Sequence, residues 1–175
     1  MAKFCENKAM LTTPSAKKLA LELEAVIQRE APLLRAFSDT HAEHRPRAGG
    51  WSRKEELGHL IDSAVNNHMH FVRAPLAETF EGPGYAQDAW VKAHGYHEFA
   101  WTKLIEWWAQ HNSLLVAVTA RIADEKLATP CRIGASEPVT LGFVIEDYIL
   151  HMQHHLDQII GRERITAYPS AAQPD

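Results

Sequence analysis

The apolar stretch 141–161 carries three closely spaced histidines, His151, His154 and His155. On an α-helix, residues four apart share a face, so His151 and His155 point the same way, one turn apart. Asp147 lies one turn earlier on that face. Two imidazoles at this spacing can chelate one metal ion, as they do in a helical H-E-x-x-H motif. The pattern therefore indicates a metal site that needs a third ligand from another element, and His59 is the best candidate.

The competing interpretation is a plain helical bundle whose histidines are held by hydrogen bonds. An apolar helix face does not bury imidazoles without partners, because each unpaired polar group costs about 1–3 kcal/mol. Neutral imidazole suits zinc, nickel, copper and iron, and three protein ligands with one open position is the catalytic arrangement for zinc. Asp147 and Asp62 are the candidates to orient an imidazole by a hydrogen bond to the ring nitrogen that does not bind the metal. His154 points about 100° away from His155 on a helix with 3.6 residues per turn, and we do not expect it to be a ligand.

The remaining histidines are weaker candidates. His68 is a spare donor on the second predicted helix, and His70 is expected to pack or to lie at the rim of the site. His94 and His97 lie near a predicted loop, where little supports a role in the site.

Single residues and missing motifs argue against several other kinds of active site. A zincin protease needs a glutamate directly after the first histidine as general base, but Met152 stands there. A carboxylate di-iron bundle needs two Glu-x-x-His motifs; Glu56 and His59 supply one, whereas Tyr148 stands three positions before His151. The chain has no G-x-S-x-G nucleophile elbow, no P-loop and no Rossmann fingerprint.

Hydrophobic periodicity predicts the elements that must position these side chains. The predicted long helices cover residues 15–37, 52 to about 73–75, 97–122 and 141–160. Thr13 is the expected N-cap of the first, with Pro14 at its first helical position, and Pro32 is expected to kink or split it. Ser52 and Glu55 fit a capping box at the start of the second.

The last predicted helix begins after Thr140 as N-cap and stops at Gly161, a favourable residue just past a helix C-terminus. Residues 87–93 are expected to form a short helix, and residues 138–139 to be briefly extended. Nothing reads as a run of alternating strands. The sequence therefore predicts an all-α fold, a four-helix bundle with one or more long crossover connections.

Length and composition set the broad class of the protein. The 175 residues suit one domain, expected at 13–161, with an N-terminal arm over 1–12 and a C-terminal tail over 162–175. A formal net charge of −4 without a basic stripe argues against nucleic-acid binding. Two cysteines outside any CxxC pattern, no signal-peptide core and no membrane-spanning run predict a cytoplasmic protein.

Two segments together resemble a known family. The run W-S-R-K-E-E-L-G-H-L-I-D, residues 51–62, resembles the W-s-x-x-E-x-x-x-H-L-x-D signature of the DinB-like superfamily. The run H-M-Q-H-H-L-D-Q-I, residues 151–159, is similar to that family's closing H-x-x-H-H-x-x-Q-I signature. Each motif alone is moderately specific, and the two in this order and separation are much more so.

The resemblance implies a bundle with a long connection between its second and third helices. It also implies a divalent metal ion, nickel, zinc or iron, on three histidines that correspond to His59, His151 and His155. Related members are thiol-dependent S-transferases and isomerases that use bacillithiol or mycothiol, and many members are homodimers. We therefore expect a metal-dependent enzyme that activates a low-molecular-weight thiol or a water for attack on a small-molecule substrate. The alternative is a non-catalytic metal-binding or stress-response protein that acts as a dimer.

Trp101 and Trp108 are candidates for a wall of such a pocket, but packing in the bundle core is the favoured interpretation for both.

Overall fold

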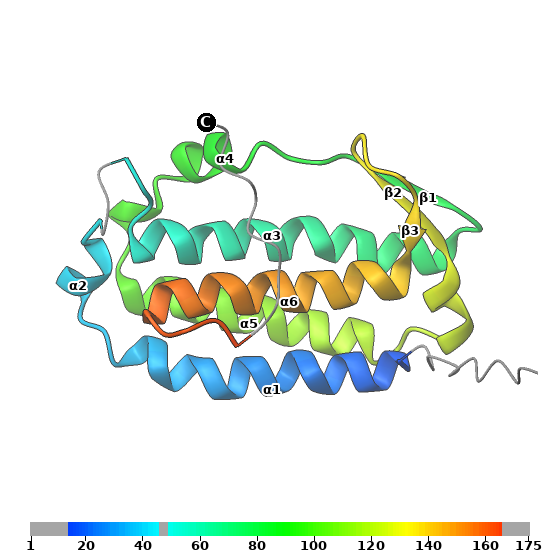
Figure 1. The fold of residues 1–175 in the computed structure, drawn as a ribbon, viewed down its shortest axis with the longest axis horizontal. Coiled ribbons are helices and arrows are strands. Elements are labelled where there is room, and N and C mark those ends of the chain that lie inside the picture. Colours follow the sequence, from blue (N-terminus) through cyan, green and yellow to red (C-terminus); the bar gives the residue numbers. More distant parts are fainter. Residues whose placement is uncertain (1–13, 46–48, 166–175) are drawn as a thin grey trace, which may run out of the picture.

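The computed structural model describes residues 14–45 and 49–165, so the expected N-terminal arm and most of the tail lie outside the described residues. Four long helices pack into a bundle (Figure 1). They are α1 (Ala16–Arg35), α3 (Arg53–Arg73), α5 (Trp101–Thr119) and α6 (Leu141–Ile160). α1 and α3 each pack against both α5 and α6. The predicted four-helix bundle is confirmed.

The helices do not simply alternate in direction. α3 and α5 run the same way, while α1 and α6 run the opposite way (Figure 1). Residues 74–100, which join α3 to α5, therefore travel back over the full length of the bundle as the expected long crossover. This crossover lies above α3 and includes β1 (Phe80–Gly82) and α4 (Gln87–His94). It forms a roof over one side of the bundle, which becomes important for the site.

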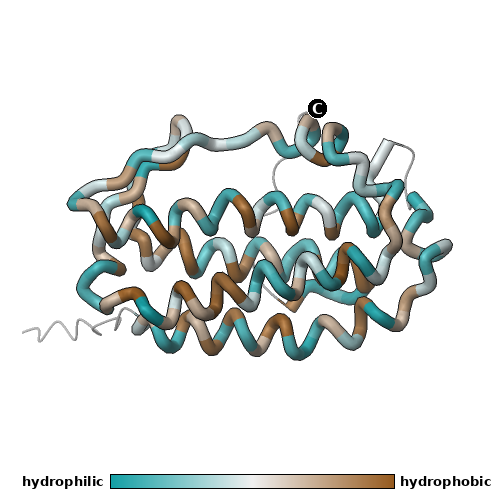
Figure 2. Tube along the Cα trace, turned by 180° about the vertical axis from the view of Figure 1, so that it is seen from behind, coloured by the Kyte–Doolittle hydropathy of each residue, from teal (hydrophilic) through white to brown (hydrophobic). Residues whose placement is uncertain are grey.

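Each long helix is amphipathic. Figure 2 shows hydrophobic and hydrophilic residues recurring in turn along all four, as expected when one face of a helix is buried. The buried faces meet in one continuous core, in which Trp101 is 1 % exposed and Trp108 is fully buried. The favoured interpretation of both tryptophans as core residues therefore agrees with the structure.

The helix ends show where local signals sufficed. The capping box of α3 is present, because Ser52 and Glu55 each accept a hydrogen bond from the other's backbone N–H. Thr140 caps α6, and Gly161 follows it in the left-handed conformation with a φ of 76°. The N-cap of α1 is Ser15, whose side chain accepts the backbone N–H of Lys18, whereas Thr13, the expected cap, lies outside the described residues.

The other helix predictions need two corrections. Pro32 does not split α1, because it lies in the last turn and removes only one hydrogen bond there. The third helix is shorter than the predicted 97–122, and Tyr96–Glu98 forms a separate 3₁₀ turn. α5 begins at Trp101, whose backbone N–H donates to the Asp39 carboxylate at 2.6 Å. That carboxylate belongs to α2 (Asp39–Glu43), so the start of α5 depends on a contact far away in sequence.

A small sheet closes the end of the bundle where α6 begins (Figure 1). Its order is β1, then β2 (Pro130–Ile133), then β3 (Val139–Thr140). β1 pairs parallel to β2, with Phe80 opposite Cys131, and β2 pairs antiparallel to β3, with Cys131 opposite Val139. The expected extension at 138–139 is thus part of a sheet that the sequence did not predict. It ties the crossover to the segment that leads into α6.

Candidate metal centre

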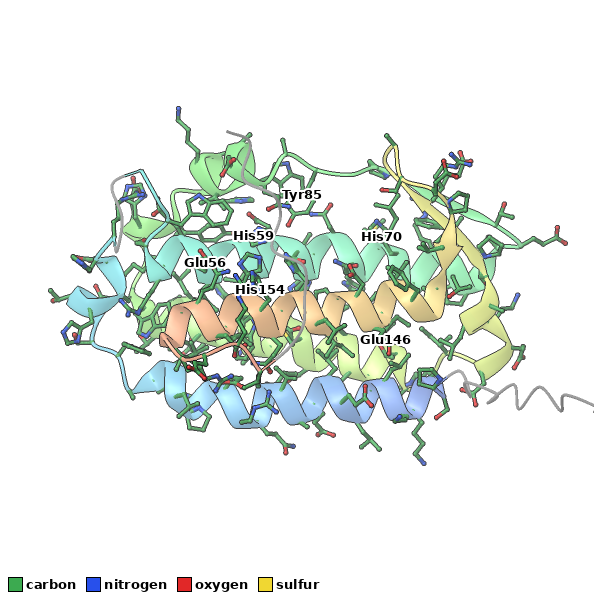
Figure 3. All side chains as sticks on the ribbon, viewed as in Figure 1. Glu56, His59, His70, Tyr85, Glu146 and His154 are labelled. Atoms are coloured by element: carbon green, nitrogen blue, oxygen red, sulfur yellow. The ribbon has the colours of Figure 1, made fainter. Side chains whose placement is uncertain are left out.

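His59, His151 and His155 converge between α3 and α6. His59 is fully buried on α3 and belongs to its second turn, where it faces α6 (Figure 3). The Nε2 atom of His151 lies 3.2 Å from that of His59 and 3.0 Å from that of His155. All three ligand nitrogens lie within 4.8 Å of one another. The two elements that carry the predicted ligands therefore bring them to one point.

These separations fit one shared ion. A zinc–imidazole bond of about 2.0–2.1 Å places two nitrogens of a tetrahedral site about 3.3 Å apart. The observed 3.0 and 3.2 Å lie close to that value, and the third pair of nitrogens lies within 4.8 Å. Among the described residues, these three histidines form the group of His, Cys, Asp or Glu side chains whose ligand atoms lie close enough together to hold a metal ion.

The electrostatics keep the ring nitrogens available as ligands. Burial, with a contribution from the nearby His155, lowers the pKa of His59 to about 3. Burial also lowers the pKa of His151 to about 2, with His155 and His59 adding to the effect. Both rings are therefore neutral at pH 7, which is the form that binds metal ions.

A carboxylate holds the third ring. Oε1 of Glu56 is hydrogen-bonded to Nδ1 of His155, and both side chains are largely buried. Because a carboxylate oxygen accepts this bond, Nδ1 carries a proton, and Nε2 is the ring nitrogen that faces the cluster. This is the carboxylate–histidine arrangement that orients ligands at many metal sites. In the sequence, Glu56 suggested only half of a di-iron motif, and its contact with His155 was not predicted.

Tyr85 approaches His59 from the crossover. Its hydroxyl lies 3.3 Å from Nδ1 of His59, and in Figure 3 the Tyr85 side chain extends from the crossover toward that ring. Burial, together with the charge of Asp62, raises the pKa of Tyr85, so the phenol stays protonated. A protonated phenol oxygen can accept the Nδ1 proton of His59, which would direct Nε2 toward the other two rings.

Asp62 does not orient a ligand, contrary to expectation. Its carboxylate accepts the Tyr96 hydroxyl at 2.6 Å and lies 3.0 Å from Nδ1 of His94. Burial raises the pKa of Asp62 against the opposing effects of Tyr96 and His94. The side chain serves to fasten the end of the crossover to α3. Asp147, the other expected orienting residue, lines a cavity that also reaches His151.

The other histidines lie outside the cluster. Nε2 of His154 contacts Nε2 of the Gln158 carboxamide at 2.6 Å, on a different face of α6 from His151, as its spacing predicts. His68 packs edge-on against His111, with ring centroids 5.8 Å apart. His70 lies against Phe80 beneath the sheet, and it lines the same cavity as His151.

Comparison with known proteins places the chain in a family. The family model of the DinB superfamily matches residues 22–159, and the chain belongs to that superfamily. No curated protein matches the chain significantly.

Among solved structures, the fold is similar to that of YfiT from Bacillus subtilis, with 20% identity and a TM-score of 0.75. The match covers 83% of this chain and 84% of YfiT, which is described as a probable metal-dependent hydrolase with an unusual four-helix bundle topology. In the described part of the chain, no helix combines the length and hydrophobicity needed to cross a membrane.

Proposed function

We propose that the protein is a metal-dependent enzyme acting on a small molecule, with a divalent ion held by His59, His151 and His155. The observation that carries the proposal is the convergence of three imidazole nitrogens from two helices. Zinc, nickel and iron all suit this donor set. Such an ion, with a coordination position left open, lowers the pKa of a bound thiol or water and so supplies a nucleophile at neutral pH.

The chain's own residues position that chemistry. Glu56 fixes the tautomer and orientation of His155, and Tyr85 does the same for His59 from the roof. The cavity beside His151 has a volume of about 300 Å³, which suits a compact substrate and not a polymer. Tyr85 brings the roof segment within hydrogen-bonding distance of His59 (Figure 3).

The reaction class proposed is nucleophilic attack by a thiol, as in an S-transferase, or by water, as in a hydrolase. The description of YfiT as a probable metal-dependent hydrolase supports the second form. The thiol form follows from the family resemblance of the two histidine motifs. Incubating the metal-loaded protein with an electrophile, with and without added thiol, separates them, because only a transferase requires the thiol. A cytoplasmic homodimer is part of the same proposal, and sedimentation analysis tests its oligomeric state.

The decisive experiment compares two neighbouring histidines. His155→Ala removes a proposed ligand, whereas His154→Ala removes an adjacent imidazole that points elsewhere. We expect stoichiometric metal in the wild type and in His154→Ala, and loss of metal from His155→Ala with the helical circular dichroism unchanged. Equal metal content in both variants, or no uptake of zinc, nickel or iron by the wild type, would contradict the proposal.

A further inference from the structure

The cavity beside His151 has an apolar part that the metal cluster does not use. The residues that line it there are Pro83 of the crossover, Ile133 of β2, Val139 of β3, and Phe143 and Val144 in the first turn of α6. They come from separate segments, which the small sheet brings together where α6 begins (Figure 1). We call these five residues the apolar wall.

Several residues of the apolar wall keep apolar surface in contact with solvent. The Phe143 side chain is 52 % exposed, and Ile133 and Val139 are only half-buried at the edge of the core. A single exposed apolar side chain is common on protein surfaces, whereas several that line one cavity indicate a ligand-binding groove. An apolar ligand group would remove this surface from water, which favours its binding.

The α3 side of the cavity is polar but uncharged. Ser63, Asn66 and Asn67 line it, and Nδ2 of each asparagine donates to a backbone carbonyl one turn earlier, at 2.9 and 3.0 Å. Asp147 lines the cavity from α6, but its side chain already takes part in an interaction within the protein, so we assign it no contact with a ligand. A charged ligand group placed against the apolar wall would lose its hydration without gaining a partner there. The wall therefore favours an uncharged group.

The apolar wall and the metal cluster border one continuous space. Val144 and His151 line the same cavity from α6, and their separation of seven residues corresponds to about 10 Å along the helix. A volume of about 300 Å³ accepts a small molecule of that length but not a polypeptide helix, which is about 10–12 Å across. The occupant that fits is a small molecule with one end at the cluster and the other against the wall.

We propose that the apolar wall binds the non-reacting part of the substrate or thiol, and that this part is an uncharged alkyl or aryl group. This assignment rests on the proposed function for the end of the ligand that reaches the metal. The substrate class is then a compact molecule with a reactive or metal-binding head beside His151 and a hydrophobic body between Phe143 and α3.

Thiols that differ only in chain length test the proposal on the cobalt(II)-loaded protein. Ethanethiol, butanethiol and hexanethiol present the same head to the metal and extend by methylene groups toward the apolar wall. Thiolate binding to cobalt gives a charge-transfer absorption band, so each dissociation constant is read without turnover. Full burial of a methylene group tightens binding by up to about fourfold, and the wall buries each in part, so we expect hexanethiol to bind about 10- to 100-fold more tightly than ethanethiol.

The double variant Val139→Thr/Phe143→Gln tests whether the apolar wall causes this preference. Both positions are partly exposed, so the circular dichroism should not change, while the ratio of the ethanethiol and hexanethiol constants should fall by about fivefold or more. Leu150→Gln is the matched control, because Leu150 is 39 % exposed on α6 but does not line the cavity. No preference for hexanethiol in the wild type, an unchanged ratio in the double variant, or an equal fall in the control would overturn the proposal and leave the metal site intact.

A second readout separates this proposal from the proposed function. Hexanol and ethanol lack a thiol, and their binding to the purified protein is followed by the methyl NMR signals of Ile133 and Val144. Saturable shifts with hexanol that disappear in the double variant support the apolar wall even if no thiol yields a cobalt band, which would refute only the thiol chemistry. The absence of saturable shifts with hexanol, or equal shifts in the wild type and the double variant, would overturn the proposal.

Discussion

The imidazole of His155 shows how one carboxylate prepares a ligand. Glu56 contacts Nδ1, so the opposite nitrogen faces His151 and His59 before any ion arrives. The two partners come from different helices, α3 and α6, and their contact also fixes the distance between them. Loss of the carboxylate should therefore weaken metal binding without removing a ligand.

Glu56→Gln tests this role directly. A carboxamide can still accept the Nδ1 proton but carries no charge, so we expect metal affinity to fall by about 10- to 100-fold. Titration against a chromophoric chelator measures the change, and Glu146→Gln on the exposed side of α6 is the charge-matched control. Unchanged affinity in Glu56→Gln would mean that Glu56 does not orient the ligand.

At the residue scale, the three histidines that cluster could be predicted from the sequence. His151 and His155 follow from helical spacing alone, and His59 follows from the family motif around it. Their partners could not, because Glu56 meets His155 only when α3 packs on α6, and Tyr85 reaches His59 only through the path of the crossover. No local pattern encodes either contact.

At the scale of elements, a buried ionic network joins α1 to the end of α6. Glu30 of α1 is fully buried and accepts hydrogen bonds from Arg29 at 2.6 Å and from Arg162 at 2.7 Å. Arg162 also donates to Asp157 of α6 at 2.8 Å. Burial acts to raise the pKa of Glu30, but the hydrogen bonds and charge of the arginines outweigh it and hold that pKa below its usual value.

This shift predicts how stability depends on pH. Because the folded pKa of Glu30 lies below its unfolded value of about 4.3, its contribution is fully present above that value and is lost as pH falls through the folded pKa. Glu30→Gln should lower the free energy of unfolding by about 1–3 kcal/mol at pH 7. Urea unfolding between pH 7 and pH 3 should show the difference from wild type shrinking in acid.

The control for this series is Glu22→Gln, one of the exposed carboxylates of α1. Its ion pair with Lys18 is long, at 3.7 Å, and both side chains are largely in solvent. Such pairs contribute about 0–1 kcal/mol, so this variant should stay close to wild type at every pH. A deficit of Glu30→Gln that does not change with pH would argue against an ionised Glu30 in the folded state.

Gly58 shows how α3 accommodates the crossover. A Cβ atom at this position would overlap the ring of Tyr96, whose hydroxyl is held by Asp62 at 2.6 Å and cannot easily move aside. Overpacking costs about 1–3 kcal/mol, whereas alanine in a helix gains about 1 kcal/mol over glycine. We expect Gly58→Ala to be less stable than wild type in thermal unfolding.

Gly142 provides the matched comparison for Gly58. It also lies in a long helix, but a Cβ there would meet its nearest neighbour, the Leu127 carbonyl oxygen, at 3.4 Å. Gly142→Ala should therefore be neutral or slightly stabilising. If both variants changed stability alike, the fit of Tyr96 against α3 would not be the cause.

The elements differ in how far local sequence determines them. The capping box at Ser52 and the cap at Thr140 are local hydrogen bonds and could be predicted. The sheet could not, because its strands are two to four residues long and β1 pairs with a segment about fifty positions away. The start of α5 escaped prediction for a similar reason, since Asp39 supplies the contact at Trp101.

At the scale of the whole molecule, the site joins the two halves of the bundle. α3 supplies one histidine of the cluster and α6 two, while the crossover that returns over α3 brings the roof above them (Figure 1). An ion bound there would link helices that are about ninety residues apart in the chain. The unfolded chain does not hold the three rings together, so binding should favour the folded state by mass action.

This linkage predicts a thermal shift. A free metal concentration 100 times the dissociation constant stabilises the folded protein by about 2.7 kcal/mol, which for a chain of this size raises the midpoint of unfolding by about 5–10 °C. Differential scanning calorimetry with added zinc or nickel measures it, and the shift should grow with the logarithm of free metal. His155→Ala should abolish the shift and His154→Ala should retain it, since only the former side chain belongs to the cluster. If a metal-dependent shift survived His155→Ala, the ion would bind elsewhere, because His59 and His151 alone could not bind it with comparable strength.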